Sequence, residues 1–176
     1  LHGFTAGKGI AIGRAHLILR GMTEVPQYNI IADELAAETT RFDNAIKASR
    51  RQLEQLRSAI PENAPTELGA FISLHLMLLT DATLSREPAD IIQEQKINAE
   101  WALKLQTDKL SQQFDEIDDA YLRERKQDML QVVERIHNNL VGQSNVFNLE
   151  TNLLEDTVLI AHDLSPADTV HFKEQR

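Results

Sequence analysis

The longest regular pattern in the chain is a stripe of mostly apolar residues that predicts one long helix. Between residues 32 and 60 these residues recur at alternating steps of four and three, which places them on one helix face. The stripe consists of Leu35, Thr39, Phe42, Ile46, Ser49, Leu53, Leu56 and Ile60. Pro61 and Pro65 follow and end the pattern, because proline cannot continue a helix interior.

A second helix is predicted from Thr66 to Leu79, with Thr66 as its N-cap. Its apolar residues cover more than one face, so it is either a central helix or one that presents apolar surface to a partner. Asp81 is then placed to cap a shorter helix over residues 82–95. Pro88 falls within its first turns, where proline disturbs a helix least.

Two further amphipathic helices complete the middle of the chain. Asn98 is the predicted cap of the first, which reaches Ile117, and Asp118 and Asp119 open the second. Gly142 is its predicted stop, because glycine is common just after the end of a helix. Four long amphipathic helices joined by short turns predict an antiparallel bundle.

Both ends of the chain show strand patterns instead. The segment 9–19 is dense in Ile, Ala and Leu but interrupted by glycine, which favours one or two short strands. Residues 156–161 form a β-branched run of the same kind. Ser165 and Pro166 then mark a helix start, at N-cap and N1. An α/β layer therefore begins at the N-terminus and resumes near residue 156.

The economical description is a helical domain inserted into an α/β domain. The fold class is mainly α: a four-helix bundle within a truncated small α/β domain. We assign residues 1–31 to the first part of the α/β domain and residues 32–142 to the helical bundle. Residues 143–176 are the incomplete return to the α/β domain.

Composition narrows the function classes. The net charge of −9 argues against a general nucleic-acid binder and suits a basic protein partner. The sequence holds no apolar run long enough to span a membrane and no cysteine, which fits a cytoplasmic location. The chain starts at Leu1 rather than methionine and stops at Arg176 in charged sequence, so we expect it to be a piece of a longer protein.

The glycine-rich start GFTAGKGIAIGRA invites a nucleotide-binding interpretation, which its spacing does not support. A P-loop needs four residues between its glycines and a hydroxyl residue after the lysine. Here only three residues separate Gly3 from Gly7, and Lys8 is followed by Gly9. The dinucleotide fingerprint fails as well. These glycines are better explained as a turn and a tight entry into a strand.

No metal or catalytic motif stands out. Glu134 and His137 form one E-x-x-H, but a di-iron site needs a second one and two more inward glutamates. The six histidines are scattered, and His75 lies on the most apolar helix, where a half-buried core or interface residue is more common than a catalytic base. We therefore predict no metal site and no bound cofactor in this chain.

Four segments, taken in order, resemble enzyme I of the bacterial phosphotransferase system. They are GIAIGRA at the start, LHLMLLTD at 74–81, DDAYLRER at 118–125 and LIAHDLSPADT at 159–169. The resemblance covers nearly the whole chain and corresponds to the N-terminal half of that family. It implies a phosphohistidine domain interrupted by a four-helix domain that docks the phosphocarrier protein HPr.

The resemblance also implies a reaction and its partners. The full enzyme takes a phosphoryl group from phosphoenolpyruvate, using Mg²⁺ in a C-terminal barrel, and passes it through a histidine to HPr in sugar uptake. Full-length enzymes of this family dimerise through the C-terminal domain, so this piece is expected to be a monomer. By position, the HPr contacts are Glu67, His75, Met77, Leu78, Asp81, Leu84, Phe114, Ile117 and Arg125.

One departure from the family decides what this piece can do. The active histidine of the family sits in a Gly-Gly-x-Thr-Ser-His type segment, which does not occur before Arg176, and His162 and His171 lack those neighbours. We therefore expect no catalysis by this piece alone. A non-catalytic helical adaptor for another partner is the alternative. A nitrogen-related paralogue or a fusion protein with the same N-terminal unit also fits.

Overall fold

The computed structural model of the protein describes residues 12–18, 25–61, 64–142 and 157–161. Helices dominate the described chain, and a short strand lies at each end of it. In order, the elements are β1 (Arg14–Ile18), the 3-10 turn η1 (Ala32–Glu34), α1 (Leu35–Ser58), α2 (Thr66–Leu78), α3 (Ala82–Ser85), α4 (Glu87–Gln95), α5 (Ala99–Asp115), α6 (Ala120–Leu140) and β2 (Thr157–Ala161).

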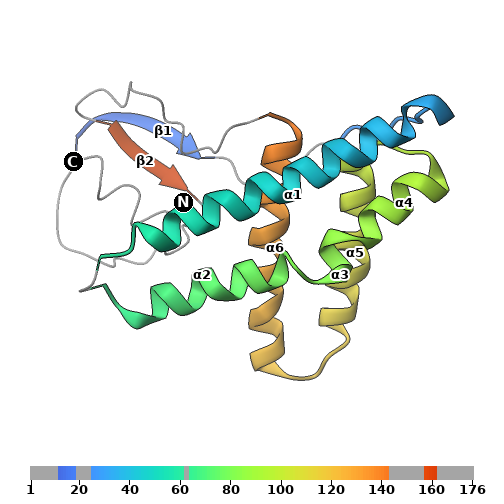
Figure 1. Cartoon of the computed structure of the whole chain (residues 1–176). Helices are drawn as coiled ribbons and strands as arrows, with labels where there is room; N and C mark the ends of the chain where they lie inside the picture. The colour runs from blue at the N-terminus through green and yellow to red at the C-terminus, as the bar shows by residue number, and fades with distance from the viewer. Residues whose placement is uncertain (1–11, 19–24, 62–63, 143–156, 162–176) are drawn as a thin grey trace.

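The long helices form two hairpins that cross each other. α1 and α2 run antiparallel side by side, and so do α5 and α6, with the second pair turned steeply against the first (Figure 1). α3 and α4 connect the hairpins and pack against α5. This arrangement confirms the predicted helical bundle, in which short connections make neighbouring helices antiparallel.

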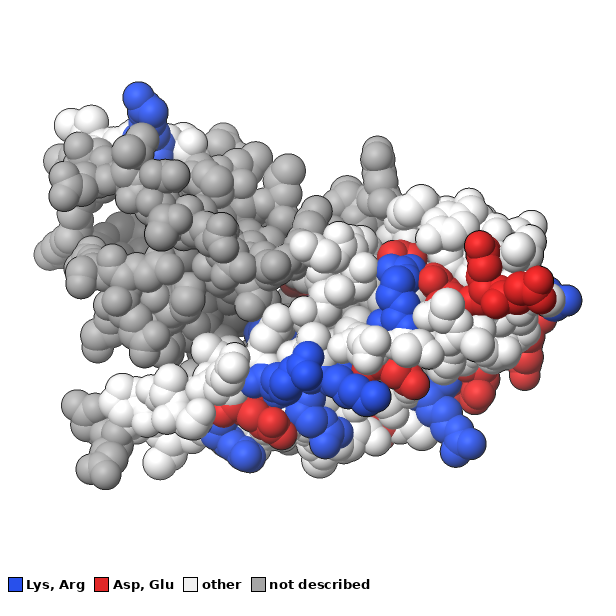
Figure 2. Space-filling view, turned by 45° about the horizontal axis from the view of Figure 1, so that its top comes forward, with Lys and Arg blue, Asp and Glu red and all other residues white. Residues whose placement is uncertain are grey.

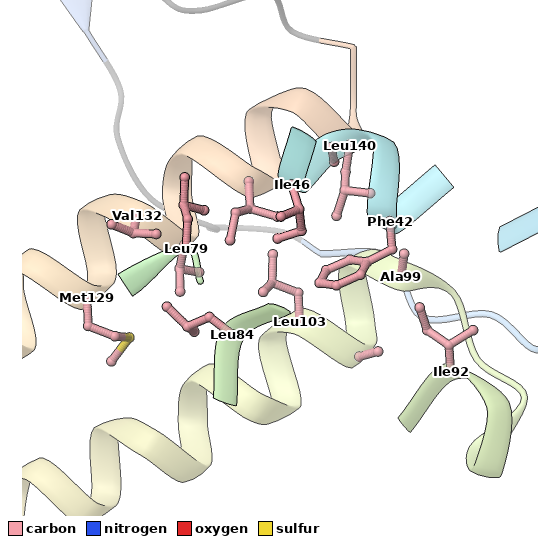
Figure 3. Packing of buried hydrophobic residues seen from close by; sticks show 14 of the residues in the cluster. Phe42, Ile46, Leu79, Leu84, Ile92, Ala99, Leu103, Met129, Val132 and Leu140 are labelled. Carbon is pink, nitrogen blue, oxygen red and sulfur yellow. The ribbon is translucent and has the colours of Figure 1, made fainter. Parts of the chain in front are cut away.

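The core lies where the two hairpins cross. Phe42 and Leu53 from α1 meet Leu103 from α5 and Ile136 from α6, and all four are fully buried. Ile46 and Ser49 fill the turns between Phe42 and Leu53, so the centre of the predicted stripe faces the core. Leu84, from the one-turn helix α3, lies among Leu79, Leu103 and Met129 (Figure 3).

The single helix predicted over residues 82–95 is wrong, because the chain breaks it into α3 and α4 at Arg86. Pro88 explains the break: it has no N–H to donate to the carbonyl of Leu84, and its ring would clash with that carbonyl. α4 therefore restarts at Glu87 with the proline in its first turn. Lys96, in the left-handed region at φ 53°, ends α4.

The predicted helix ends are only partly right. Asp81 caps α3, as predicted. Gly142 has a φ of 66°, which residues other than glycine rarely adopt. Thr66 is wrong as an N-cap: it is the first residue of α2, and Pro65 occupies the cap position. Asn98 does stand at the N-cap of α5, but its side chain makes no capping bond to that helix.

The strand patterns at the two ends belong together, as predicted. β1 and β2 pair in parallel, with Ala15 opposite Val158 and Ile18 opposite Ala161. All the described helices therefore lie between two strands of one sheet, the kind of long crossover that parallel pairing requires. The predicted helix start at Ser165 and Pro166 lies outside the described residues.

The guanidinium of Arg41 ties together the ends of three helices. Its Nε and Nη2 donate to the carboxylate of Glu38 at 2.9 and 2.6 Å. Its Nη1 and Nη2 donate to the two carboxylate oxygens of Glu100, both at 2.7 Å. Nη1 also donates to the carbonyl of Leu140, at the end of α6, at 3.0 Å. All five N–H groups of the arginine are therefore used.

The same cluster also binds residues 26–28, the segment that precedes the first helix. Glu38 accepts the backbone N–H of Ala99 at 2.7 Å and so caps α5 from a neighbouring helix. The Nδ2 of Asn98 donates to Glu100 at 2.9 Å and to the carbonyl of Pro26 at 3.0 Å, and its Oδ1 accepts the N–H of Tyr28 at 3.1 Å. This explains why Asn98 makes no helix cap.

The ionisation of Glu100 provides a test of this cluster. Burial alone would raise the pKa of Glu100, but hydrogen bonds from Arg41 and Asn98 outweigh it and lower that pKa from 4.5 to about 2. Its stabilising contribution is thus complete above pH 4.5 and is lost as the pH falls toward 2. Glu100→Gln should lower the free energy of unfolding at pH 7, with the deficit shrinking between pH 4.5 and 2.

Urea denaturation at each pH measures this difference. Glu54→Gln, at an exposed position of α1, is the matched control and should show no such pH-dependent deficit. A deficit for Glu100→Gln that stays constant from pH 7 to pH 2 would contradict the assignment.

Candidate functional site: a docking surface

The nine predicted contact residues are exposed, partly buried or fully buried. Glu67 and Asp81 are exposed, Met77 is 60% exposed and Ile117 36%. Leu78, Phe114 and Arg125 are partly buried, whereas His75 and Leu84 belong to the interior. The surface that remains therefore lies on α2, on the α2–α3 junction and around the α5–α6 turn.

The outer face of α2 carries no charge over most of its length. No Asp, Glu, Lys or Arg occurs between Glu67 and Asp81, and the exposed positions in that interval include Ala70, Ser73 and Met77. Spacings of three and four place these positions on one face. An exposed helix face usually carries charged side chains, so this uncharged face with a prominent methionine has the character of a contact surface.

Leu84 is wrong as a surface contact. Its side chain is 1% exposed and packs into the cluster with Leu79, Leu103 and Met129. With α3 only four residues long, Leu84 is its one buried residue and holds the turn against the core. It therefore supports the surface from below.

His75 is wrong as a surface contact as well: of the two predicted positions, half-buried core or interface, the structure places it in the core and buries it fully. The residue is 2% exposed, and its ring centroid lies 4.0 Å from that of Phe71. Burial, with a smaller effect of Arg135, lowers the pKa of His75 to about 4, so the ring is neutral at pH 7. A buried neutral imidazole without access to solvent serves packing here.

Asp128 of α6 lies near the buried His75 of α2 without forming a hydrogen bond to it. Its Oδ1 lies 4.0 Å from the Nε2 of His75, and its Oδ2 accepts the Nη1 of Arg125 at 3.2 Å. This carboxylate therefore holds Arg125 on α6, on the side of α2 that carries the buried His75 and not the exposed Met77. Sequence reasoning missed Asp128, although its three-residue spacing from Arg125 on a helix was a usable signal.

The remaining charges form a rim. Asp81 caps α3, and the backbone and hydroxyl hydrogen bonds from Thr83 lower the pKa of its carboxyl. Lys126 donates to both oxygens of Asp115 at 2.7 Å, which joins the two sides of the α5–α6 turn. Glu67 lies at the far end of α2, about 15 Å from Met77 along the axis. Met77 and Asp81 thus lie close in sequence at the α2–α3 junction, whereas Glu67 lies at the other end of α2.

Other kinds of site find little support among the described residues. Within that part of the chain, no group of three or more His, Asp or Glu side chains could hold a metal ion. No single helix there has the length and apolarity to cross a membrane, although the bent pair Thr66–Leu78 and Ala82–Gln95 meets those criteria jointly. Basic and acidic side chains lie interspersed on the face drawn in Figure 2, whereas nucleic-acid binding needs a continuous cationic one.

Comparison with known proteins identifies the family. The family model described as "PEP-utilising enzyme, N-terminal" matches residues 2–125, which is more than half of the chain. The chain belongs to this family. The match includes α2, α3 and the α5–α6 turn, so all nine predicted contact residues lie within the matched region.

Curated relatives extend the similarity over nearly the whole chain. A phosphoenolpyruvate-protein phosphotransferase of Cupriavidus necator is 42% identical over 98% of this chain, which corresponds to 31% of that protein. The proteins of the same name from Streptococcus equinus and Bacillus subtilis are 31% and 32% identical, each over 99% of the chain. The chain thus spans about 30% of the length of these relatives.

Two solved structures share the fold. One is a solution NMR structure of Enzyme I, with a TM-score of 0.73 and 27% identity over 94% of this chain and 66% of that one. The other is the N-terminal domain of the nitrogen Enzyme I, with a TM-score of 0.70 and 27% identity over 93% of this chain and 65% of that one. The resemblance to enzyme I inferred from four short motifs is confirmed.

The interior position of Leu84 gives a test that separates core from surface. Leu84→Asp would bury an unpaired charge, so we expect the free energy of unfolding to fall by more than about 4 kcal/mol. Met77→Asp, at an exposed position two turns earlier, should change it by no more than about 0.5 kcal/mol. Urea denaturation followed by circular dichroism measures both, and a stable Leu84→Asp protein would contradict the assignment.

Proposed function

We propose that this chain supplies the HPr-docking surface of a phosphoenolpyruvate–protein phosphotransferase. The observation that carries the proposal is the uncharged outer face of α2, which ends on the exposed Met77 and is followed by the exposed acid Asp81. An apolar centre with a charged rim is the composition of a transient protein interface. The names of the relatives and the fold of the N-terminal part of enzyme I support the same function.

In this proposal the full-length enzyme moves a phosphoryl group in two steps. The group passes from phosphoenolpyruvate to a histidine nitrogen with release of pyruvate, and then from that nitrogen to a histidine of HPr. Histidine suits this chemistry because its unprotonated nitrogen is nucleophilic near neutral pH. Mg²⁺ would belong to the phosphoenolpyruvate step, which takes place on a part of the full-length enzyme outside this sequence.

The described part of this chain contributes binding to that sequence of steps. His75, on the docking helix, is 2% exposed and cannot reach a partner's histidine. His162 and His171 lie outside the described residues, and neither has the flanking glycines and hydroxyl residues of the family's active segment. We therefore propose that the 176-residue piece binds HPr without phosphorylating it.

The net charge of −9 and the exposed acids Asp81 and Glu67 suit a basic partner surface. Complementary charge mainly speeds encounter and fixes orientation, while the apolar centre provides most of the affinity. We further propose a cytoplasmic role in sugar uptake, with a monomeric piece and a dimeric full-length enzyme. The nitrogen-related form remains a second candidate, because the two solved structures match this chain at the same 27% identity.

Titration of isotope-labelled chain with HPr tests the docking proposal. Amide shifts should change over residues 67–84 and 114–125, and the affinity should fall with added salt as the rim charges are screened. Met77→Ala should raise the Kd about fivefold to tenfold, as expected for a residue at the centre of an interface. Lys47→Ala, at an exposed position of α1, is the control and should leave the Kd unchanged.

Two results would count against HPr docking at this surface. One is a set of shift changes confined to Gly3–Ala15. The other is the absence of any change at saturating HPr, which would favour the adaptor for another partner.

A further inference from the structure

The most unusual polar side chain outside the Arg41 cluster is Gln106 of α5. It is 1% exposed and lies against the break between α3 and α4. Its Nε2 donates to the backbone carbonyl of Thr83 at 2.9 Å and to the Oε2 of Glu87 at 2.8 Å. Burying an amide is costly unless it is hydrogen-bonded, and these two bonds use both N–H groups of the amide. Its Oε1 is buried and accepts no hydrogen bond from the described residues.

The break itself explains why a donor is needed there. In a continuous helix the carbonyl of Thr83 would accept the N–H of Glu87, but the chain changes direction at Arg86, between them. The N–H groups of Ser85 and Arg86 still reach the carbonyls of Asp81 and Ala82. The carbonyl of Thr83, one position further along, receives the amide of Gln106.

The same short stretch carries the acid of the docking surface. The Oδ1 of Asp81 accepts the backbone N–H of Thr83 at 2.9 Å and its hydroxyl at 2.7 Å. Thr83 thus accepts a hydrogen bond from Gln106 at its carbonyl and donates two hydrogen bonds to Asp81. At this point the helix axis bends by 61° between Thr66–Leu78 and Ala82–Gln95, so the direction of the Asp81 side chain depends on how α3 is fixed.

A second contact reinforces the position of the junction. The Nζ of Lys109 donates to Glu87 Oε2 at 3.0 Å, so this oxygen accepts from both Gln106 and Lys109 on successive turns of α5. The hydrogen bonds from Lys109 and Gln106 lower the pKa of Glu87. The carboxylate therefore stays ionised at neutral pH and keeps α4 fastened to α5.

We propose that Gln106 is a positioning residue for partner docking: it fixes the α3–α4 junction and thereby the orientation of Asp81 in the docking surface. The residue does not touch the partner. The expected effect on the affinity for the partner rests on the proposed function. The expected effect on the α3–α4 junction concerns the free chain alone.

Gln106→Met tests the proposal, because methionine keeps the length of the side chain and removes both donors. Gln112→Met is the matched control on the same helix, where the exposed Gln112 donates only to Glu116 at 3.1 Å. In the free chain, amide exchange at residues 82–87 should accelerate in Gln106→Met and remain unchanged in Gln112→Met. With HPr, the Kd should rise about tenfold in Gln106→Met alone.

A double-mutant cycle separates positioning from general loosening. If Gln106 acts through Asp81, Gln106→Met should raise the Kd much less in an Asp81→Asn background than in the wild type. Equal increases in both backgrounds, or unchanged exchange at residues 82–87, would overturn the proposal. Failure of the wild-type chain to bind HPr would overturn the proposed function instead, and the exchange measurement would still decide whether Gln106 holds the junction.

Discussion

The helical arrangement depends on one saturated guanidinium. Arg41 satisfies both carboxylates of Glu38 and Glu100 and the last carbonyl of α6, while Glu38 caps α5. One cation facing two carboxylates leaves a net negative charge, which is favourable here because both acids lie at the positive N-terminal end of α5. The Arg41 cluster fixes the ends of α1, α5 and α6 relative to each other. The apolar core forms where these helices cross.

The proposed docking surface consists of an exposed layer and a buried layer that supports it. Met77 and Asp81 face outward, while Leu84, His75 and Gln106 lie beneath them and set where they stand. The inner residues include a polar one because the break between α3 and α4 leaves the carbonyl of Thr83 to be bonded by a side chain, which an all-apolar layer could not do. A surface that lies over a broken helix therefore needs a buried polar residue beneath it, which bonds the backbone group left by the break.

Sequence periodicity predicts the four long helices and the strand pair, but it misses the break between α3 and α4 and is insufficient for the site. The stripe from Leu35 to Ile60 and the proline stops predicted α1 because steps of three and four leave little choice of face. Motif similarity placed Leu84 and His75 at the surface, since a motif gives position along the chain and carries no information on which way a side chain points after a bend. Asn98 occupies the predicted N-cap position, but the sequence pattern could not show that its side chain bonds elsewhere, because Pro26 and Tyr28 are more than 65 positions away.

The parallel pairing of β1 with β2 has a consequence for the order of folding. Ala15 and Val158 are 143 positions apart, and closing a flexible loop of that length costs roughly 4 kcal/mol from the length-dependent entropy alone. The two helix hairpins need only local contacts and shorten the effective loop once they form. The strands should therefore meet last during folding, and the helices act as the scaffold that brings the two ends of the sheet within reach.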